Sequence, residues 1–181
     1  MLGIMTILLG VIYPLFITGI AQVVFPSKAN GSVVDINGTL RGSELMGQKT
    51  DTAIYFSTRP SATDYNTLAS GSSNLGLTSQ KLYDLVQSRK TDFIAKNNLS
   101  DNTDIPSDML FTSASGLDPH ISPQAAKIQV NRVSGARSFS EEQKRQLNVL
   151  VNRLTEKPQF GILGCARVNV FILNLELDKL K

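Results

Sequence analysis

The sequence is nearly devoid of the residues that form covalent cross-links or zinc sites. It has one cysteine, Cys165, one histidine, His120, and no tryptophan among 181 residues. A lone cysteine cannot close an intramolecular disulfide, and it cannot build a His/Cys zinc site with a single histidine unless other ligand types join. The composition therefore excludes disulfide scaffolds and zinc folds.

An excess of charge of one sign is also missing. The 18 basic and 15 acidic side chains give a net charge of only +3, and they alternate along the polar part with short clusters such as Lys144-Arg145. Binding to nucleic acid phosphates needs a concentrated basic face, so we expect no nucleic acid partner. The length suits one compact domain plus an anchor.

Residues 1–25 contain no charged side chain, and the first charge is Lys28. An apolar helix of about 20 residues spans the hydrocarbon core of a bilayer, so this run predicts a transmembrane anchor ahead of a domain at residues 26–181. A cleaved signal peptide is the alternative, because Gly19 and Ala21 are spaced like the small residues before a cleavage site. The length of the run and the lack of a preceding Lys or Arg favour the anchor.

Small or polar residues recur at every fourth position of this segment and would form one ridge on a helix. They are Thr6, Gly10, Pro14, Thr18 and Gln22. Small residues let helices approach closely in lipid, which predicts a packing face for a partner helix. Gly and Pro are also common in membrane helices, so a chance spacing stays open.

The first part of the polar domain has strand and loop signals. Residues 32–36 read as a strand that enters a turn at Asn37-Gly38, and the returning strand is expected at 39–46. Tyr55-Phe56 begins another extended piece. From 57 to 79 the chain is dominated by Ser, Gly, Asn and Thr, which predicts a long loop and a candidate contact surface.

The second part has helix signals. Helical spacing of apolar residues predicts a helix from 79 to 96, Ser122-Pro123 resembles an N-cap followed by proline, and Ser140 begins a capping box for a third helix. The β-branched run 167–173 reads as a strand. These elements predict an α+β fold with a small mixed sheet and about three helices.

Sequence motifs for catalysis or metal binding have little support. The Gly-rich segment 70–76 lacks the Lys-Ser/Thr ending of a P-loop, and Ser113-Ala114-Ser115-Gly116 is not a G-x-S-x-G elbow. Asp118 and His120 could form an acid/base pair or part of a cation site, but a structural role in a turn is favoured because a second strong ligand and a nucleophile are not evident. An exported hydrolase or binding protein that uses this pair is the alternative function. We expect no catalytic residue and no metal site.

Several uncommon segments, in order along nearly the whole chain, resemble the C subunit (KdpC) family of the Kdp-type potassium-transporting ATPase. They are VIYPL at 11–15, NGS at 30–32, RGS at 41–43 with GQ at 47–48, YFSTRPSA at 55–62, YN at 65–66, SGSSNL at 70–75, TSASGLDPHISP at 112–123, and VNV at 168–170 with LNL at 173–175. Two departures are the missing basic residue before the apolar run and Ser72 or Ser73 where the family often has a second glycine.

The resemblance implies a non-catalytic accessory subunit of a high-affinity, ATP-driven potassium uptake complex. Its partners would be a channel-like potassium-binding subunit, a P-type ATP-hydrolysing subunit and a small single-span subunit. The family is described as a catalytic chaperone that raises the ATP affinity of the hydrolysing subunit, so ATP enters by resemblance only. Without a Walker motif here, an effect on ATP would more simply be coupled through the membrane helices.

The resemblance also implies a single-pass protein of the bacterial cytoplasmic membrane with its domain on the outer side. Lys28 and Arg41 weakly favour a cytoplasmic domain by the positive-inside rule, but long domains can cross regardless of flanking charge. We therefore expect the domain on the outer side, as the resemblance implies.

The motif residues are expected to be docking or framework surfaces, because turn-forming residues specify backbone shape more tightly than side-chain chemistry. They are Arg59, Pro60, Gly71, Asn74, Asp118, Pro119 and His120. Shape should then matter more than charge. Gly71→Val and Pro119→Ala are expected to impair assembly or transport, whereas Asp118→Asn and His120→Gln should be tolerated.

Overall fold

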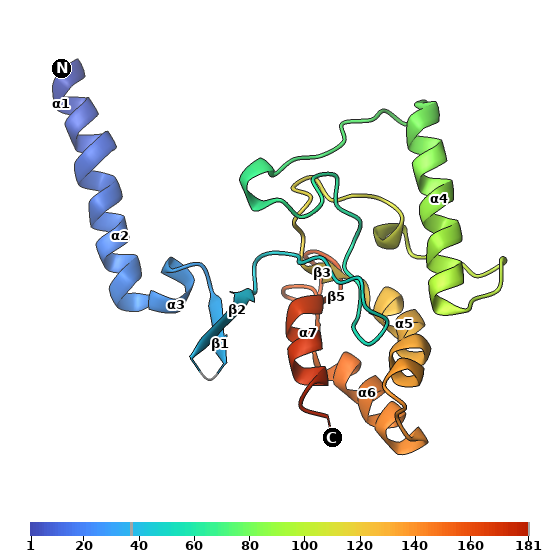
Figure 1. The fold of residues 1–181 in the computed structure, drawn as a ribbon. Coiled ribbons are helices and arrows are strands. Elements are labelled where there is room, and N and C mark those ends of the chain that lie inside the picture. The colour runs from blue at the N-terminus through green and yellow to red at the C-terminus, as the bar shows by residue number, and fades with distance from the viewer. Residues whose placement is uncertain (37, 181) are drawn as a thin grey trace. The chain divides into compact units, whose positions relative to one another are not determined.

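The computed structural model describes residues 1–36 and 38–180. The chain forms two compact units, Met1–Leu45 and Met46–Lys181, whose elements are labelled in Figure 1.

The first unit begins with one apolar helix, Leu2–Val24, of 23 residues. It comprises α1 (Leu2–Ile7), a π-helical segment η1 (Leu8–Ile12) and α2 (Tyr13–Val24), followed by the short α3 (Pro26–Ala29). The π-helical segment ends at Ile12, two residues before Pro14, whose missing N–H and bulky ring disturb the regular hydrogen-bond ladder. The apolar helix predicted from the sequence is confirmed, and by length and composition it can cross a bilayer.

A two-stranded antiparallel hairpin completes this unit, with β1 at Val33–Ile36 and β2 at Thr39–Ser43. The returning strand is shorter than predicted, since it ends at Ser43 and does not continue to 46. There the Ser43 hydroxyl donates to the Gly31 carbonyl at 2.6 Å and accepts from the Leu45 N–H, which turns the chain. Asn37 of the predicted turn lies outside the described residues.

In the second unit the segment after the hairpin is irregular. Residues 55 and 56 form no strand, contrary to the prediction, because their backbone groups pair with side chains of helices. The long loop predicted at 57–79 is confirmed, and its regular structure is the single turn η2 (Thr67–Ala69).

The three predicted helices of the domain are present as α4 (Gln80–Asn97), α5 (Pro123–Ala136) and α6 (Glu141–Arg153), with a 3₁₀ turn η3 (Ser107–Met109) between the first two. Ser122 caps α5 by accepting from the Ala125 N–H at 3.1 Å. Ser140 forms the predicted capping box with Gln143. Ser79 is the N-cap residue of α4 but makes no side-chain cap bond.

The prediction of a strand over 167–173 is largely wrong. Only β5 (Arg167–Asn169) is extended, and α7 (Val170–Leu177) follows at once. Asn169 accepts from the Ile172 N–H at 3.2 Å and so starts the helix, and Leu173 and Leu177 are then fully buried one turn apart. Burial on one helical face outweighs the β-propensity of the run.

Strand β5 lies between β3 (His120–Ile121) and β4 (Thr155–Glu156), and both pairings are antiparallel. The α+β class is confirmed. In detail, the strands among the described residues form two separate antiparallel sheets where one mixed sheet was predicted.

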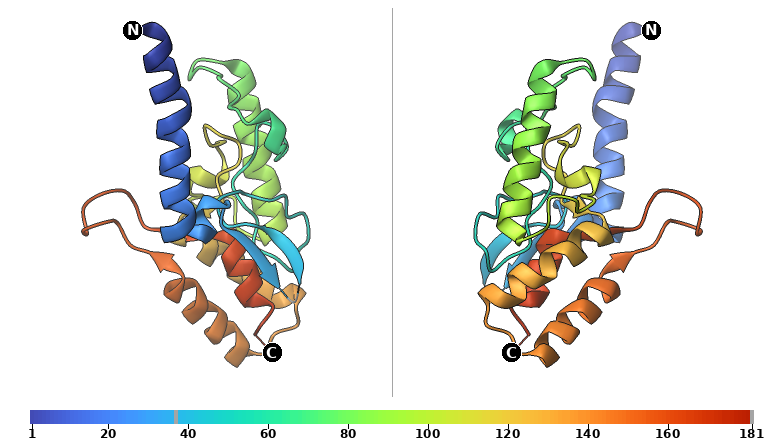
Figure 2. Two further views of the ribbon diagram at one scale, coloured as in Figure 1. Left: turned by 90° about the vertical axis from the view of Figure 1, so that its left-hand side faces the viewer. Right: turned by 90° about the vertical axis from the view of Figure 1, so that its right-hand side faces the viewer.

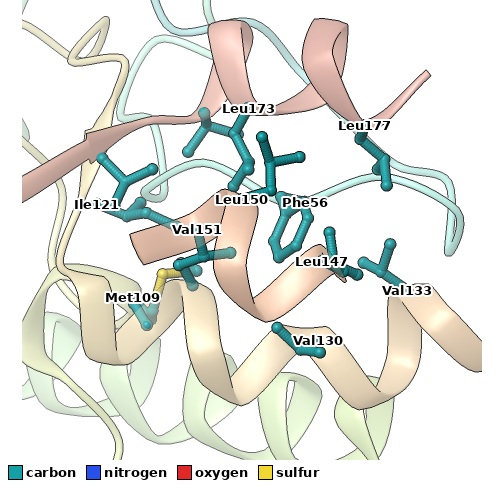
Figure 3. Packing of buried hydrophobic residues seen from close by; sticks show 14 of the residues in the cluster. Phe56, Met109, Ile121, Val130, Val133, Leu147, Leu150, Val151, Leu173 and Leu177 are labelled. Carbon is teal, nitrogen blue, oxygen red and sulfur yellow. The ribbon is translucent and has the colours of Figure 1, made fainter. Parts of the chain in front are cut away.

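The core of the second unit lies between α5, α6 and α7, as Figure 3 shows. Phe56 inserts into it from the irregular segment and is fully buried. Full burial of a phenylalanine contributes about 1.5–3 kcal/mol, so this side chain holds the 55–62 segment against the helices. The labelled neighbours are Met109, Ile121, Val130, Val133, Leu147, Leu150, Val151, Leu173 and Leu177.

Candidate functional site

Two helix carboxamides bind the backbone at Phe56 and Ser57 in place of a neighbouring strand. Gln129 of α5 accepts from the Ser57 N–H at 2.8 Å and donates to its carbonyl at 3.2 Å. Asn174 of α7 does the same for Phe56, at 2.8 and 3.0 Å. Each carboxamide supplies one donor and one acceptor, so the backbone is fully paired without a sheet.

Arg132 extends this arrangement in the interior. Its guanidinium donates to the carbonyls of Ala53 and Tyr55 at 2.6 and 3.0 Å, to Asn97 Oδ1 at 3.0 Å and to Gln129 Oε1 at 2.7 Å. Burial lowers the pKa of Arg132, but a guanidinium stays protonated in proteins. Four neutral acceptors therefore surround the buried cation, and α4, α5 and the 53–57 segment are joined through it.

Arg59, Asp118 and His120 form a second cluster. Asp118 accepts from Arg59 Nη1 at 3.0 Å through one carboxylate oxygen. The other oxygen accepts from the His120 backbone N–H at 3.0 Å and lies 3.1 Å from His120 Nδ1. Partial burial alone would raise the pKa of Asp118, but the His120 hydrogen bonds and the Arg59 charge outweigh it, so the pKa is lowered.

Motif loops that are far apart in the sequence meet at Gly116. The Ser115 carbonyl accepts from the Gly71 N–H at 2.9 Å and from the Ser70 hydroxyl at 3.1 Å. Gly116 has a φ of +68°, and a Cβ there would lie 2.9 Å from the Gly71 carbonyl oxygen. On the other side, Gly47 N–H donates to the Leu117 carbonyl at 2.6 Å.

Tyr65 fixes the turn that carries Arg59. Its hydroxyl donates to the Arg59 carbonyl at 2.6 Å and accepts from the Thr58 hydroxyl at 2.8 Å. Its backbone N–H donates to Ser61 Oγ at 2.9 Å. Burial raises the pKa of Tyr65, which keeps the phenol protonated and able to donate.

We call these contacts together the framework cluster, and it includes some of the predicted site residues but not all. Arg59, Asp118 and His120 meet directly, and Gly71 joins through Ser115. Pro119 is buried, and its carbonyl accepts from the Val170 N–H at 2.9 Å. Pro60 is half-buried and Asn74 is exposed with a φ of 51°; neither takes part in the hydrogen bonds given above.

The ridge residues of the first unit are exposed along the apolar helix. Thr6 donates to the Leu2 carbonyl at 3.0 Å, and Gly10 lies in the π-helical segment with open space around it. Gln22 exchanges two hydrogen bonds with Asn30, at 3.1 and 3.2 Å. These bonds occupy the Gln22 carboxamide at the end of the helix.

Sequence reasoning missed Gln129 and Arg132 as site residues. A signal was present, because Gln129 and Arg132 are polar residues at the helical spacing of the apolar positions in the predicted helix. The structure buries both of them together with Ala125, Ala126 and Val133. Buried polar side chains are found with hydrogen-bond partners, so their placement there points to something they bind. Asn174 stands inside one of the motif segments but was assigned no role.

Comparisons with known proteins point to one family. Residues 1–179 match the family described as "KdpC: K+-transporting ATPase, c chain". A potassium-transporting ATPase KdpC subunit of Koribacter versatilis is 50% identical over 175 residues, covering 96% of this chain and 88% of the relative. The subunits of Geobacter metallireducens and Clostridioides difficile are 47% and 40% identical, covering 99% and 98% of this chain and 94% and 92% of theirs.

The family match spans both units, from the apolar helix to α7, and the named relatives are covered almost end to end. Arg59, Asp118 and His120 all lie within the matched residues. The chain therefore belongs to the KdpC family, the c chain of the K⁺-transporting ATPase.

Proposed function

We propose that this chain is a non-catalytic accessory subunit of the potassium-transporting complex. In this proposal Leu2–Val24 anchors it in the bacterial cytoplasmic membrane, and the domain contributes to assembly and coupling. Its partners are a channel-like potassium-binding subunit, a P-type ATP-hydrolysing subunit and a small single-span subunit. By the family's description, it acts as a catalytic chaperone that raises the ATP affinity of the hydrolysing subunit.

The observation that carries the proposal is that the motif side chains bind other groups of the same domain. Both carboxylate oxygens of Asp118 are engaged by Arg59 and His120, and Ser115 Oγ accepts from the Leu117 N–H at 3.1 Å. These groups hold loops in a fixed shape, as expected of a surface recognised by another protein. A hydrolase would instead need a nucleophile, an oriented base and an oxyanion site assembled together.

If the domain lies on the outer side, it can change the ATP affinity of the hydrolysing subunit only by allosteric coupling. Such coupling is a free energy shared between two sites, and it requires differential contacts in the states of the partner. We infer that the contacts are made at the domain surface and along the apolar helix, where Thr6, Gly10, Pro14 and Thr18 offer a close-packing face. ATP itself then needs no site on this chain.

The proposal is tested with the purified complex. Omitting this subunit should abolish or strongly weaken potassium-dependent ATP hydrolysis. Adding it back should restore the hydrolysis and lower the ATP concentration that gives half of the maximal rate. Asp118→Asn and His120→Gln keep hydrogen-bonding size, so both variants should retain the wild-type potassium requirement. A large rise in that requirement for either variant alone would mean that Asp118 and His120 serve a cation site or a reaction.

The side of the membrane is tested by cysteine labelling. Because Cys165 is the chain's one cysteine, Cys165→Ser provides a background in which Lys127→Cys, at an exposed position of α5, is the single reporter. We expect a membrane-impermeant maleimide to label it in intact spheroplasts. Labelling that appears only after permeabilisation would put the domain on the cytoplasmic side.

A further inference from the structure

An extended loop between β4 and β5, residues 157–166, departs from the rest of the second unit; we call it the apolar hairpin. In both views of Figure 2 this loop reaches out beyond the helices next to it. Its two arms are joined by reciprocal backbone hydrogen bonds between Gln159 and Leu163, both 2.9 Å.

The turn of the apolar hairpin has a defined geometry. The Gln159 carbonyl also accepts from the Ile162 N–H at 3.2 Å, which closes a β-turn inside the three-residue loop 160–162. Phe160 and Gly161 are its central residues, and their φ values of +54° and +78° have the positive sign of a primed turn. Glycine adopts this conformation readily, but a phenylalanine there is unfavourable. The backbone therefore holds an aromatic residue at the tip at some cost in conformational energy.

The tip exposes three large apolar side chains. Phe160 is 91% exposed, Ile162 82% and Leu163 57%, while Lys157 is exposed at the base. Arg167 at the other side of the base is paired with Glu156 at 2.9 Å. This combination of one aromatic side chain, two aliphatic side chains and an exposed lysine suits the boundary between the headgroups and the acyl chains of a bilayer.

We propose that the apolar hairpin inserts Phe160, Ile162 and Leu163 into the interfacial layer of the bilayer that holds the chain, with Lys157 directed to anionic headgroups. The proposal rests on the membrane anchor proposed above. Leu2–Val24 keeps the domain at the bilayer surface, which raises the effective concentration of lipid for any loop of the domain.

Interface size favours lipid over a protein partner at this tip. A stable protein interface buries roughly 800 Å² on each side, which three side chains on a narrow hairpin do not supply. Insertion into lipid needs no minimum interface area, because each apolar side chain that leaves water makes its own favourable contribution to the binding free energy.

The absence of tryptophan from the chain makes the test specific. Phe160→Trp introduces one fluorophore at the tip of the full-length chain in vesicles that contain phosphatidylglycerol with brominated acyl chains. We expect a blue-shifted emission that the bromines quench. Leu68→Trp, at a position 96% exposed in the 57–79 loop, should emit as in water and stay unquenched.

The charge at the base is tested in the same vesicles. The attraction of one lysine to an anionic surface raises the equilibrium constant for lipid contact about fivefold. Lys157→Gln in the Phe160→Trp chain should therefore lower that constant by about the same factor. Replacing phosphatidylglycerol with phosphatidylcholine should have a similar effect. An unchanged quenching in both cases would overturn the role of Lys157.

Four results would overturn insertion. Emission at the water-exposed wavelength without bromine quenching would exclude lipid contact, and a blue shift that grows only with protein density would indicate a second copy. A shift that needs the potassium-binding subunit and is not quenched would indicate a protein contact. Loss of the chain from vesicles in an alkaline wash would overturn the anchor as well, whereas retention without quenching overturns the hairpin proposal alone.

Discussion

Replacing Arg132 with methionine should lower the free energy of unfolding by about 3–4 kcal/mol. A buried acceptor left without a donor costs about 1–3 kcal/mol, and this side chain serves one buried and two partly buried acceptors. The guanidinium supplies the donors for the carbonyls of Ala53 and Tyr55 and for Asn97 Oδ1. Methionine fills a similar volume but donates nothing. Urea denaturation of the full-length chain in detergent, followed by circular dichroism, measures the change.

Arg153→Met is the matched control for this experiment. Arg153 also lies on a domain helix, but it is largely exposed, and among the described residues it is paired with Glu176, at 3.3 Å. Exposed ion pairs contribute about 0–1 kcal/mol, so this variant should unfold nearly as wild type does. Equal effects of the two substitutions would show that the buried guanidinium does not hold the 53–57 segment in place.

Gly116→Val should destabilise the domain by about 2–5 kcal/mol. A left-handed φ costs a β-branched residue roughly 1–3 kcal/mol, and overpacking adds a similar amount. The Cβ would come within 2.9 Å of the Gly71 carbonyl oxygen and 3.0 Å of Thr63 Oγ1. Separation of these loops should also reduce co-purification with the other subunits, which is measured beside urea denaturation.

Gly71→Val supplies the control, and the structure changes what is expected of it. The sequence alone suggested that Gly71 is constrained, but a Cβ there meets nothing within 4 Å and its φ is outside the left-handed region. A valine at 71 should therefore change the stability by less than about 1 kcal/mol. If Gly71→Val is as damaging as Gly116→Val, the close approach at Gly116 is not what fixes these loops.

The two variants also separate shape from charge in the framework cluster. Gly116→Val changes the loop backbone and leaves Asp118 and Arg59 chemically intact, whereas Asp118→Asn removes the charge and keeps the shape. If the domain works by presenting a rigid surface, subunit co-purification should fall for the first variant and persist for the second. The opposite order would favour a ligand that depends on the carboxylate.

Several features were determined by the sequence alone because their causes are local. The uncharged run up to residue 25 specifies an apolar helix whatever surrounds it. Ser122 and Ser140 begin α5 and α6 through hydrogen bonds to residues three positions ahead, so the signals lie within one helical turn. The motif segments were likewise recognisable as an ordered set.

Other features were decided only by the tertiary structure. The run 167–173 carries β-branched residues, yet from Val170 it is helical, because Leu173 and Leu177 must face the core between α5 and α6. Propensity differences are a fraction of a kilocalorie per residue, whereas burial of a leucine contributes about 1.5–3 kcal/mol, so packing prevails.

The same reasoning applies to the framework cluster. Hydrogen bonds that join Gln129 to Ser57, Asn174 to Phe56 and Arg59 to Asp118 span 59 to 118 positions of the chain. Residue type and local spacing determine where a helix begins. Which distant backbone or carboxylate a polar side chain reaches depends on the packing of α5 and α7 around Phe56, so only the folded domain determines those partners.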